Sequence, residues 1–238
     1  MKLSLMTAAF FAITLSACGG SSKGSNDNNP AAVTTASDAE VIANLKSSNI
    51  DFLTFRRPAG TWRWSATPQQ HILVYVPTPA NGNAVEQDYA NKTQNAITLI
   101  NTKLRNLLIL EAVSTIPLNS NFIQVSYGTS YVPAGSTDYK SYCANVSEGP
   151  SIGNMIQPNE QNGINSNPVF INLGNGHCDV TQDIVTHEFG HALGLSNHFN
   201  GFGNGAAIST VFWDVLATLY GNPQSTPAQN LLVRRAGN

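Results

Sequence analysis

The residues with the clearest chemical potential are two histidines and a glutamate within residues 187–191. They read H-E-x-x-H, with His187, Glu188 and His191 at the fixed places. On a helix, residues four apart share one face, so both imidazoles would point the same way. Neutral imidazole is a common ligand of Zn²⁺. Glu188 would be rotated by about 100° from His187, so it could flank a metal without binding it and accept a proton from a metal-bound water.

The residues around this motif are typical of one amphipathic helix with defined ends. Asp179, with Gln182 three residues later, is typical of a capping box at a helix N-terminus. Gly194 follows where the helix would end, and glycine favours the left-handed conformation that closes a helix. Between these ends, apolar residues recur at helical spacing, at Val180, Ile184, Val185, Phe189, Ala192 and Leu193.

A third imidazole, His198, follows shortly after this predicted helix end. If the helix continued through Gly194, His198 would lie about 16 Å along the axis from His187. Only a chain reversal at Gly194 would bring it to the same metal. We predict His198 as the third ligand. Asn197, a weak oxygen donor, and Asp214, the only acidic residue further along the chain, remain as alternatives.

The run from His187 to Gly194 resembles the metzincin zinc peptidases, in their matrixin-like branch. The signature of that family is H-E-x-x-H-x-x-G-x-x-H. One departure is a single residue long, because the third histidine of the family would fall at Asn197 and here histidine comes next, at His198.

A second departure concerns the apolar floor beneath the metal. The family places a methionine there, in a turn between the third histidine and the last helix, yet no methionine follows Met155. We expect Ile208 or a neighbour to line this floor. Some family members add a tyrosine ligand, but Tyr220 lies too deep in the last predicted helix to be assigned that role.

The resemblance implies a zinc-dependent endopeptidase acting on proteins or peptides. Zinc held by three histidines would keep a fourth position for water, and Glu188 would draw off its proton and pass it to the leaving amine. A substrate strand would pair with an edge strand, which we predict at residues 151–157. Calcium in the Asn- and Gly-rich loops has no support in the sequence.

A non-catalytic, metzincin-like surface binding lipoprotein is the alternative function. In that case the departures at Asn197 and at the missing methionine would mark a lost activity. Glu188 favours the enzyme, because a purely structural zinc site would not need it.

The N-terminus is typical of an export signal followed by a linker. Residues 1–17 combine Lys2 with a short apolar run and resemble a lipoprotein signal peptide, because the run ends in Leu-Ser-Ala before Cys18. The resemblance implies lipid attachment at Cys18 and, with Gly19 following, an anchor in the bacterial outer membrane, on its periplasmic or outer side. Residues 18–37 carry almost no large apolar side chain, so we expect a lipid-anchored flexible tether.

Two further cysteines, Cys143 and Cys178, are expected to form a disulfide in an oxidising compartment. The alternative is a free thiol that binds zinc in a latent form, but the matrixin switch sequence Pro-Arg-Cys-Gly is absent. We expect His71 to be structural, and His177, beside Cys178, to be kept away from the metal.

Residues 38–238 have the length of one domain, and we expect a monomer. Charged residues make up 11% of the chain and the formal net charge is −2. Because no basic cluster is present, nucleic acid is not an expected partner.

The pattern of these residues indicates an α/β (α+β) domain. The resemblance narrows this to a metzincin-like zincin domain, a mixed twisted sheet with a long backing helix, an active-site helix and a C-terminal helix. In order, we predict a helix at 38–50, a strand at 71–76, a helix at 85–108, strands at 109–116 and 122–127, the edge strand, a strand at 169–173, the motif helix and a helix at 211–220.

Overall fold

The computed structural model describes residues 35–53, 60–65, 71–118, 121–154, 156, 164 and 168–237. The predicted signal peptide, the predicted lipidation site Cys18 and most of the predicted tether lie outside these residues. Within them, no helix has both the length and the apolar character needed to cross a membrane.

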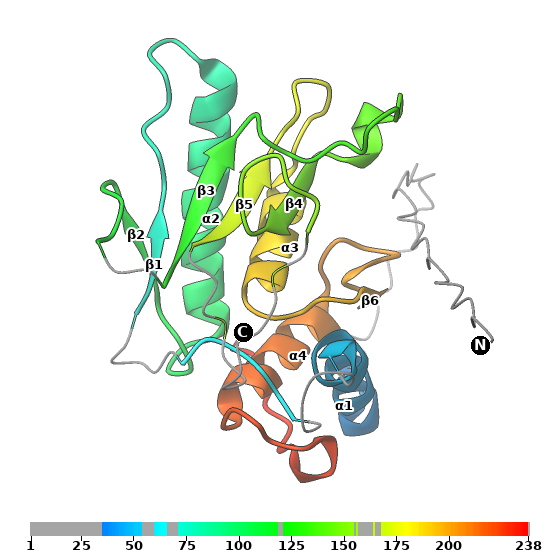
Figure 1. The fold of residues 1–238 in the computed structure, drawn as a ribbon. Helices are drawn as coiled ribbons and strands as arrows, with labels where there is room; N and C mark the ends of the chain where they lie inside the picture. Colours follow the sequence, from blue (N-terminus) through cyan, green and yellow to red (C-terminus); the bar gives the residue numbers. More distant parts are fainter. Residues whose placement is uncertain are drawn as a thin grey trace, which may run out of the picture.

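A five-stranded mixed sheet forms one half of the described structure (Figure 1). The strands lie in the order β2-β1-β3-β5-β4. Four of them are parallel, and β4 pairs antiparallel with β5 at one edge. Their bounds are β1 Ile72–Tyr75, β2 Leu110–Val113, β3 Phe122–Tyr127, β4 Ala144–Ser147 and β5 Val169–Leu173.

Two helices, α2 (Ala84–Lys103) and α3 (Gln182–Ala192), lie against this sheet and against each other (Figure 1). α2 packs on β2, and α3 packs on β4 and β5. The side chains between the layers are aliphatic and fully buried, among them Ile100, Ile171 and Val185. The helix with the H-E-x-x-H motif is therefore anchored along its length to the antiparallel edge of the sheet.

The other half contains α1 (Asp38–Leu45) and α4 (Thr210–Gly221), which pack against each other (Figure 1). All residues of α4 from Phe212 to Tyr220 are buried. The C-terminal segment returns over α4, where the backbone of Leu232 exchanges two hydrogen bonds with the side chain of Asn222. Two very short strands, β6 (Phe199–Asn200) and β7 (Gly203–Asn204), belong to the loop between α3 and α4.

The predicted mixed α/β class is confirmed, and β3 and β5 have the predicted bounds. The helix predicted at 38–50 starts at Asp38 but changes after Leu45 into a π-helical turn, Lys46–Ile50. The strand predicted at 109–116 is shorter, Leu110–Val113.

The long helix predicted at 85–108 ends earlier, at Lys103. Asn106 adopts a left-handed φ of 67°, which interrupts a right-handed helix. The chain then turns back, and the side chain of Asn101 exchanges two hydrogen bonds of 2.8 Å with the backbone of Leu110. The apolar spacing beyond Lys103 thus belongs to a turn that leads into β2.

The predicted edge strand at 151–157 is wrong for the residues described. Ser151 has a left-handed φ of 56°, which an extended strand does not allow. The antiparallel edge strand is β4, Ala144–Ser147, immediately after Cys143. The sequence analysis missed this strand because only Val146 in it is a strong β-former.

Candidate metal site

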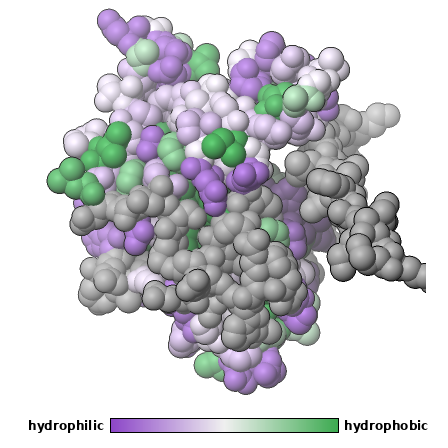
Figure 2. Space-filling model, viewed as in Figure 1, coloured by the Kyte–Doolittle hydropathy of each residue, from purple (hydrophilic) through white to green (hydrophobic). Residues whose placement is uncertain are grey.

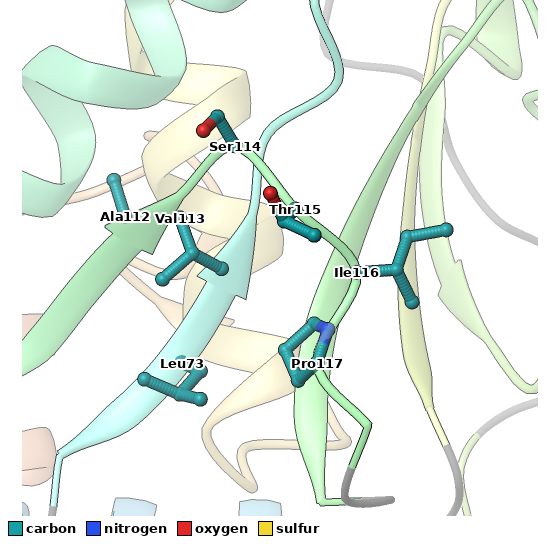
Figure 3. Close-up of a pocket in the computed structure, with 7 residues that line it drawn as sticks. All are labelled: Leu73, Ala112, Val113, Ser114, Thr115, Ile116 and Pro117. Carbon is teal, nitrogen blue, oxygen red and sulfur yellow. The ribbon is translucent and has the colours of Figure 1, made fainter.

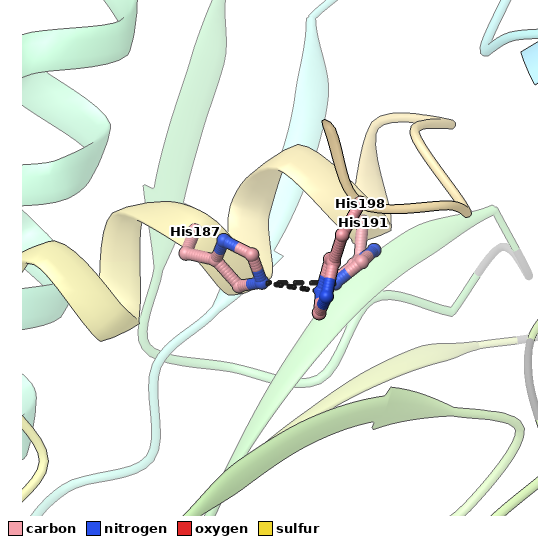
Figure 4. A group of neighbouring side chains, drawn as sticks. All are labelled: His187, His191 and His198. Carbon is pink, nitrogen blue, oxygen red and sulfur yellow. Dashed lines mark hydrogen bonds between the residues drawn. The ribbon is translucent and has the colours of Figure 1, made fainter. Parts of the chain in front are cut away.

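Three imidazoles meet at the C-terminal end of α3 (Figure 4). The Nε2 atom of His187 lies 3.0 Å from that of His191 and 3.1 Å from that of His198. The third separation, between the Nε2 atoms of His191 and His198, is 3.2 Å. The predicted triad therefore forms a group that could hold a metal ion.

Helix α3 starts at a different cap from the one expected. The N-cap is Thr181, whose side chain accepts a hydrogen bond of 3.3 Å from the amide of Ile184. Asp179 instead lies 3.8 Å from the ammonium of Lys92, which also donates to the carbonyl of Val180 at 2.8 Å. Thr181 therefore caps the helix in place of the predicted Asp179.

The end of α3 is the chain reversal that the sequence required. Gly194 has φ of 113°, its amide donates to the carbonyl of His191, and the amide of Leu195 donates to the carbonyl of Gly190, both at 3.0 Å. This pair of hydrogen bonds is a Schellman motif with Gly194 at its left-handed position. The reversal turns the chain toward the imidazoles instead of along the helix axis.

Three buried side chains from distant parts of the chain satisfy the last carbonyls of this helix. The indole of Trp64 donates to Ala192 at 2.7 Å, the hydroxyl of Tyr220 donates to Leu193 at 2.9 Å, and the amide of Asn49 donates to Gly194 at 2.7 Å. Helix ends leave such carbonyls without intrahelical partners, and burial makes that costly. Together these hydrogen bonds fix the helix end from which the third imidazole is presented.

The one-residue departure from the metzincin spacing has a clear structural cause. Asn197 is exposed and turned outward, with its side-chain amide donating to the carbonyl of Ser47 at 2.9 Å. The amide of Ser196 donates to the carbonyl of Ser48 at 2.7 Å. Because the π-helical turn Lys46–Ile50 holds these residues from outside, the next residue, His198, points inward.

The outer nitrogens of two imidazoles are bound to backbone carbonyls. His187 Nδ1 lies 3.0 Å from the carbonyl oxygen of Ala207, and His191 Nδ1 lies 2.5 Å from that of Leu195. Because a carbonyl oxygen only accepts, each Nδ1 must carry the proton and each Nε2 must present a lone pair. The close approach of two such lone pairs is repulsive unless they share a cation, and this is the arrangement usual for metal-ligating histidines.

The separations of the three Nε2 atoms fit zinc. In a tetrahedral site with Zn–N bonds of about 2.0–2.1 Å, two ligand nitrogens lie about 3.3–3.4 Å apart. The separations here, 3.0–3.2 Å, are about 0.1–0.4 Å shorter. Three neutral nitrogen donors on one side leave room for a further ligand.

Burial keeps these imidazoles in the neutral form that binds metals. It lowers the pKa of His187 to about 4, with a smaller effect from His198, and outweighs the opposing hydrogen bond to Ala207. Burial and the neighbouring imidazoles lower the pKa of His191 well below its ordinary value, and burial lowers that of His198. At pH 7 no proton has to leave before a metal binds.

Glu188, which directly follows His187 on α3, is a buried polar residue with incomplete hydrogen bonding. Its side chain is 6% exposed, and Oε2 has no hydrogen-bond partner within the described part of the chain. Burial raises the pKa of its carboxyl to about 8. A buried carboxyl oxygen without a hydrogen-bond partner costs stability, and such perturbed groups concentrate at functional sites.

The loop after the triad, residues 198–207, supplies more than the third imidazole. Gly203 has φ of 78°, and a Cβ added there would lie 2.6 Å from His198 Cγ and Cδ2. The His198 ring therefore packs directly on the backbone of Gly203. Ala207, at the end of the same loop, carries the carbonyl that orients His187.

The apolar floor beneath the imidazoles is Phe202, a residue that the sequence analysis missed. Its ring centroid lies 4.3 Å from that of His187, 4.9 Å from that of His191 and 5.6 Å from that of His198. Ile208, expected at this position, packs half-buried against the main core instead. A sequence signal exists, because Phe202 lies between two glycines shortly after His198, and such glycines permit a tight turn.

The alternative ligand Asp214 lies elsewhere. It is buried and accepts hydrogen bonds from Arg235 Nη1 at 2.8 Å and from the amide of Ala236 at 3.0 Å. His71 pairs with Glu111 at 2.6 Å, and the exposed His177 packs on Tyr139. Neither histidine belongs to the metal-binding group, as expected.

The predicted disulfide between Cys143 and Cys178 is present, with the two Cα atoms 5.6 Å apart. Cys143 directly precedes β4, and Cys178 lies three residues before Thr181, the N-cap of α3. The bridge therefore joins the antiparallel edge of the sheet to the entrance of the metal-site helix.

A surface hollow lies at the other edge of the sheet (Figure 3). It lies beside β2, and none of its lining side chains is ionisable: Leu73, Ala112, Val113, Ser114, Thr115, Ile116 and Pro117. Figure 2 shows hydrophobic residues on one face in small separate groups among polar ones. Among the described residues, the triad is the group of side chains that could hold a metal ion.

The comparisons with known proteins leave the site to be interpreted from its own geometry. No family model matches the chain, and a search of curated proteins gives no significant match.

Proposed function

We propose that this protein is a zinc-dependent endopeptidase with a metzincin-like site, in which His187, His191 and His198 hold the metal. The observation that carries the proposal is the convergence of three Nε2 atoms, with separations of 3.0–3.2 Å, next in sequence to the buried Glu188, whose Oε2 has no hydrogen-bond partner among the described residues. When bound, zinc supplies a Lewis acid and lowers the pKa of a coordinated water toward about 7.

Glu188 is the proton carrier in this proposal. The residue follows His187 on α3 and does not belong to the metal-binding group. Its carboxyl, with a pKa raised to about 8 by burial, is suited to accept a proton when a charged metal favours the carboxylate and to release it to a leaving amine.

The edge strand β4 is the proposed docking edge for an extended substrate. Among the described residues, β4 pairs with β5 and has no other strand partner, and α3 packs against both strands. An extended peptide added to this edge would gain backbone hydrogen bonds that do not depend on its side chains. The strand order with one antiparallel edge strand also supports the metzincin-like fold. We further propose, from the sequence alone, that the protein is lipid-anchored through Cys18.

Cleavage of a denatured protein by the purified, zinc-loaded chain tests the proposal. We expect hydrolysis that a chelator abolishes and added zinc restores, and little hydrolysis by Glu188→Gln at the same zinc content. If the zinc-loaded protein cleaves no substrate in a broad panel of peptides and denatured proteins, a binding function takes the place of the enzyme.

A further inference from the structure

Phe202 is a buried residue whose ring lies between the three imidazoles and the hydrophobic core. Its side chain is fully buried, and its ring lies 4.3, 4.9 and 5.6 Å, between centroids, from the three imidazoles of the triad. On its other side it stacks on Phe212, with centroids 5.2 Å apart and an interplanar angle of 15°. One aromatic ring thus separates the ligand group from the core beneath it.

The backbone around Phe202 is arranged to bring the ring close. Phe199 and Phe202 exchange two backbone hydrogen bonds, of 3.0 and 2.8 Å, which closes a tight turn. Gly201, inside this turn, has φ of 88°, a conformation that favours glycine. The turn folds Phe202 back under the histidine that precedes it, His198.

Helix α3 also makes room for this ring. Gly190 lies in the interior of the helix, where glycine is unfavourable. A Cβ at Gly190 would come within 2.8 Å of Phe202 Cε2 and within 2.7 Å of Phe212 Cε2. Because Gly190 has no side chain, Phe202 and Phe212 can pack closely against α3, the helix that carries His187 and His191.

We infer that Phe202 is a positioning residue for the metal ligands, setting the orientation of the three imidazoles and shielding the underside of the site from water. The inference rests on the proposed zinc function and deepens it. The ring of Phe202 is 30° from parallel to that of His187 and 89° from that of His198, with centroids 4.3 and 5.6 Å away, so it contacts the two imidazoles in different orientations. Positive charge shared by the imidazoles on metal binding would be attracted to an aromatic face.

The test compares two buried phenylalanines. Phe202→Leu removes the ring that contacts the imidazoles, whereas Phe212→Leu removes a fully buried ring from the layer beneath. Zinc affinity is measured by chelator competition, and coordination geometry by the visible spectrum of bound cobalt(II). Thermal unfolding of the metal-free variants gives the loss of fold stability separately.

We expect Phe202→Leu to weaken zinc binding by about 10-fold or more, in the range of substitutions that disturb ligand orientation, and to change the cobalt spectrum. Phe212→Leu should change zinc affinity by no more than about threefold and leave the cobalt spectrum unchanged. Its loss of fold stability should be similar to that of Phe202→Leu. Phe202→Met, of similar volume but flexible, is measured beside Phe202→Leu. If Phe202→Leu does not fold, the measurements on Phe202→Met test the positioning role instead.

Unchanged affinity and an unchanged cobalt spectrum in the Phe202 variants would overturn the inference, as would an equal loss in Phe212→Leu. If neither Phe202 variant folds while Phe212→Leu does, Phe202 is a core residue and the positioning role is also overturned. Failure of the proposed function looks different. In that case the unmodified protein binds no zinc, or it binds zinc with the predicted dependence on Phe202 but hydrolyses no peptide.

Discussion

The imidazole of His198 lies directly on the backbone of Gly203, so closely that a Cβ at Gly203 would be 2.6 Å from two of its ring atoms. The third imidazole is therefore oriented from below by a residue without a side chain. Residues 198–207 contain both partners of this contact, as well as Phe202 and the Ala207 carbonyl that orients His187.

Gly203→Ala is expected to displace His198 and to weaken zinc binding by at least about 10-fold. Gly205→Ala is the matched control, because Gly205 has a similar φ of 76° and its added Cβ would meet only Asn200 Oδ1, at 3.1 Å. Both variants carry the same backbone strain, and only one carries the collision with the imidazole. Equal zinc affinities in the two variants, measured by chelator competition, would contradict the expected role of Gly203.

Glu188→Gln and His198→Ala should fail in different ways. Glu188→Gln should retain about one zinc per chain and lose about 10²–10⁴-fold in peptide hydrolysis, the usual range for general acid–base catalysis. His198→Ala should lose zinc as well as turnover. Elemental analysis beside a peptide-hydrolysis assay separates the two outcomes.

Asn197→Ala and Asp214→Asn are the controls for the choice of third ligand. Both should retain zinc, since Asn197 points outward to Ser47 and Asp214 binds Arg235. If either variant loses its zinc while His198→Ala keeps it, His198 is not the third ligand.

Tyr220→Phe removes only the hydroxyl that donates to the carbonyl of Leu193 at the end of α3. Leaving this buried carbonyl without its partner should lower the free energy of unfolding by about 1–3 kcal/mol and should also weaken zinc binding. Tyr127→Phe is the control, because its hydroxyl donates to the carbonyl of Pro77, away from the triad. In urea unfolding, both variants should be less stable than the unmodified protein. In zinc titration, only Tyr220→Phe should bind zinc more weakly.

Replacing both Cys143 and Cys178 by serine should lower the free energy of unfolding by about 3–4 kcal/mol on the chain-entropy model. The reason is that the bridge joins residues separated by 35 positions. Urea unfolding of the oxidised protein and of the double variant measures the difference. A stability equal to that of the oxidised protein would show that the bridge contributes nothing to the fold.

Cys18→Ser tests the proposed lipid anchor. The variant should move from the membrane fraction to the soluble fraction after expression in a bacterium that processes lipoproteins, because the sulfur that would carry the lipid is gone. Membrane association of the variant equal to that of the unmodified protein would count against lipidation.

The metal-binding triad could be predicted from the sequence because its residues lie within one short stretch of the chain. The spacing of His187 and His191 on one helix, and the glycine that ends that helix, are both properties of a short stretch. The disulfide was likewise predictable from the presence of two further cysteines, and the strands β3 and β5 from short runs rich in β-branched and aromatic residues.

The parts that could not be predicted depend on contacts between distant residues. Phe202 becomes the floor of the site only because a tight turn and Gly190 bring it under the imidazoles. β4 is a strand because β5 pairs with it, and its own residues have weak β-propensity. The end of α2 at Lys103 and the cap of α3 at Thr181 are accompanied by contacts of Asn101 and Lys92 with residues outside α2.

The closed turn between Phe199 and Phe202 has a consequence for how related sites are recognised. The third imidazole is placed by hydrogen bonds on both sides of it, from Ser196 and Asn197 to the π-helical turn and between Phe199 and Phe202, and not by the number of residues counted from the helix. Such an arrangement leaves room for a residue that points outward before the histidine, as Asn197 does. A search that demands a fixed spacing after H-E-x-x-H would discard chains built this way. A search for a histidine followed within a few residues by a glycine-flanked aromatic would retain them.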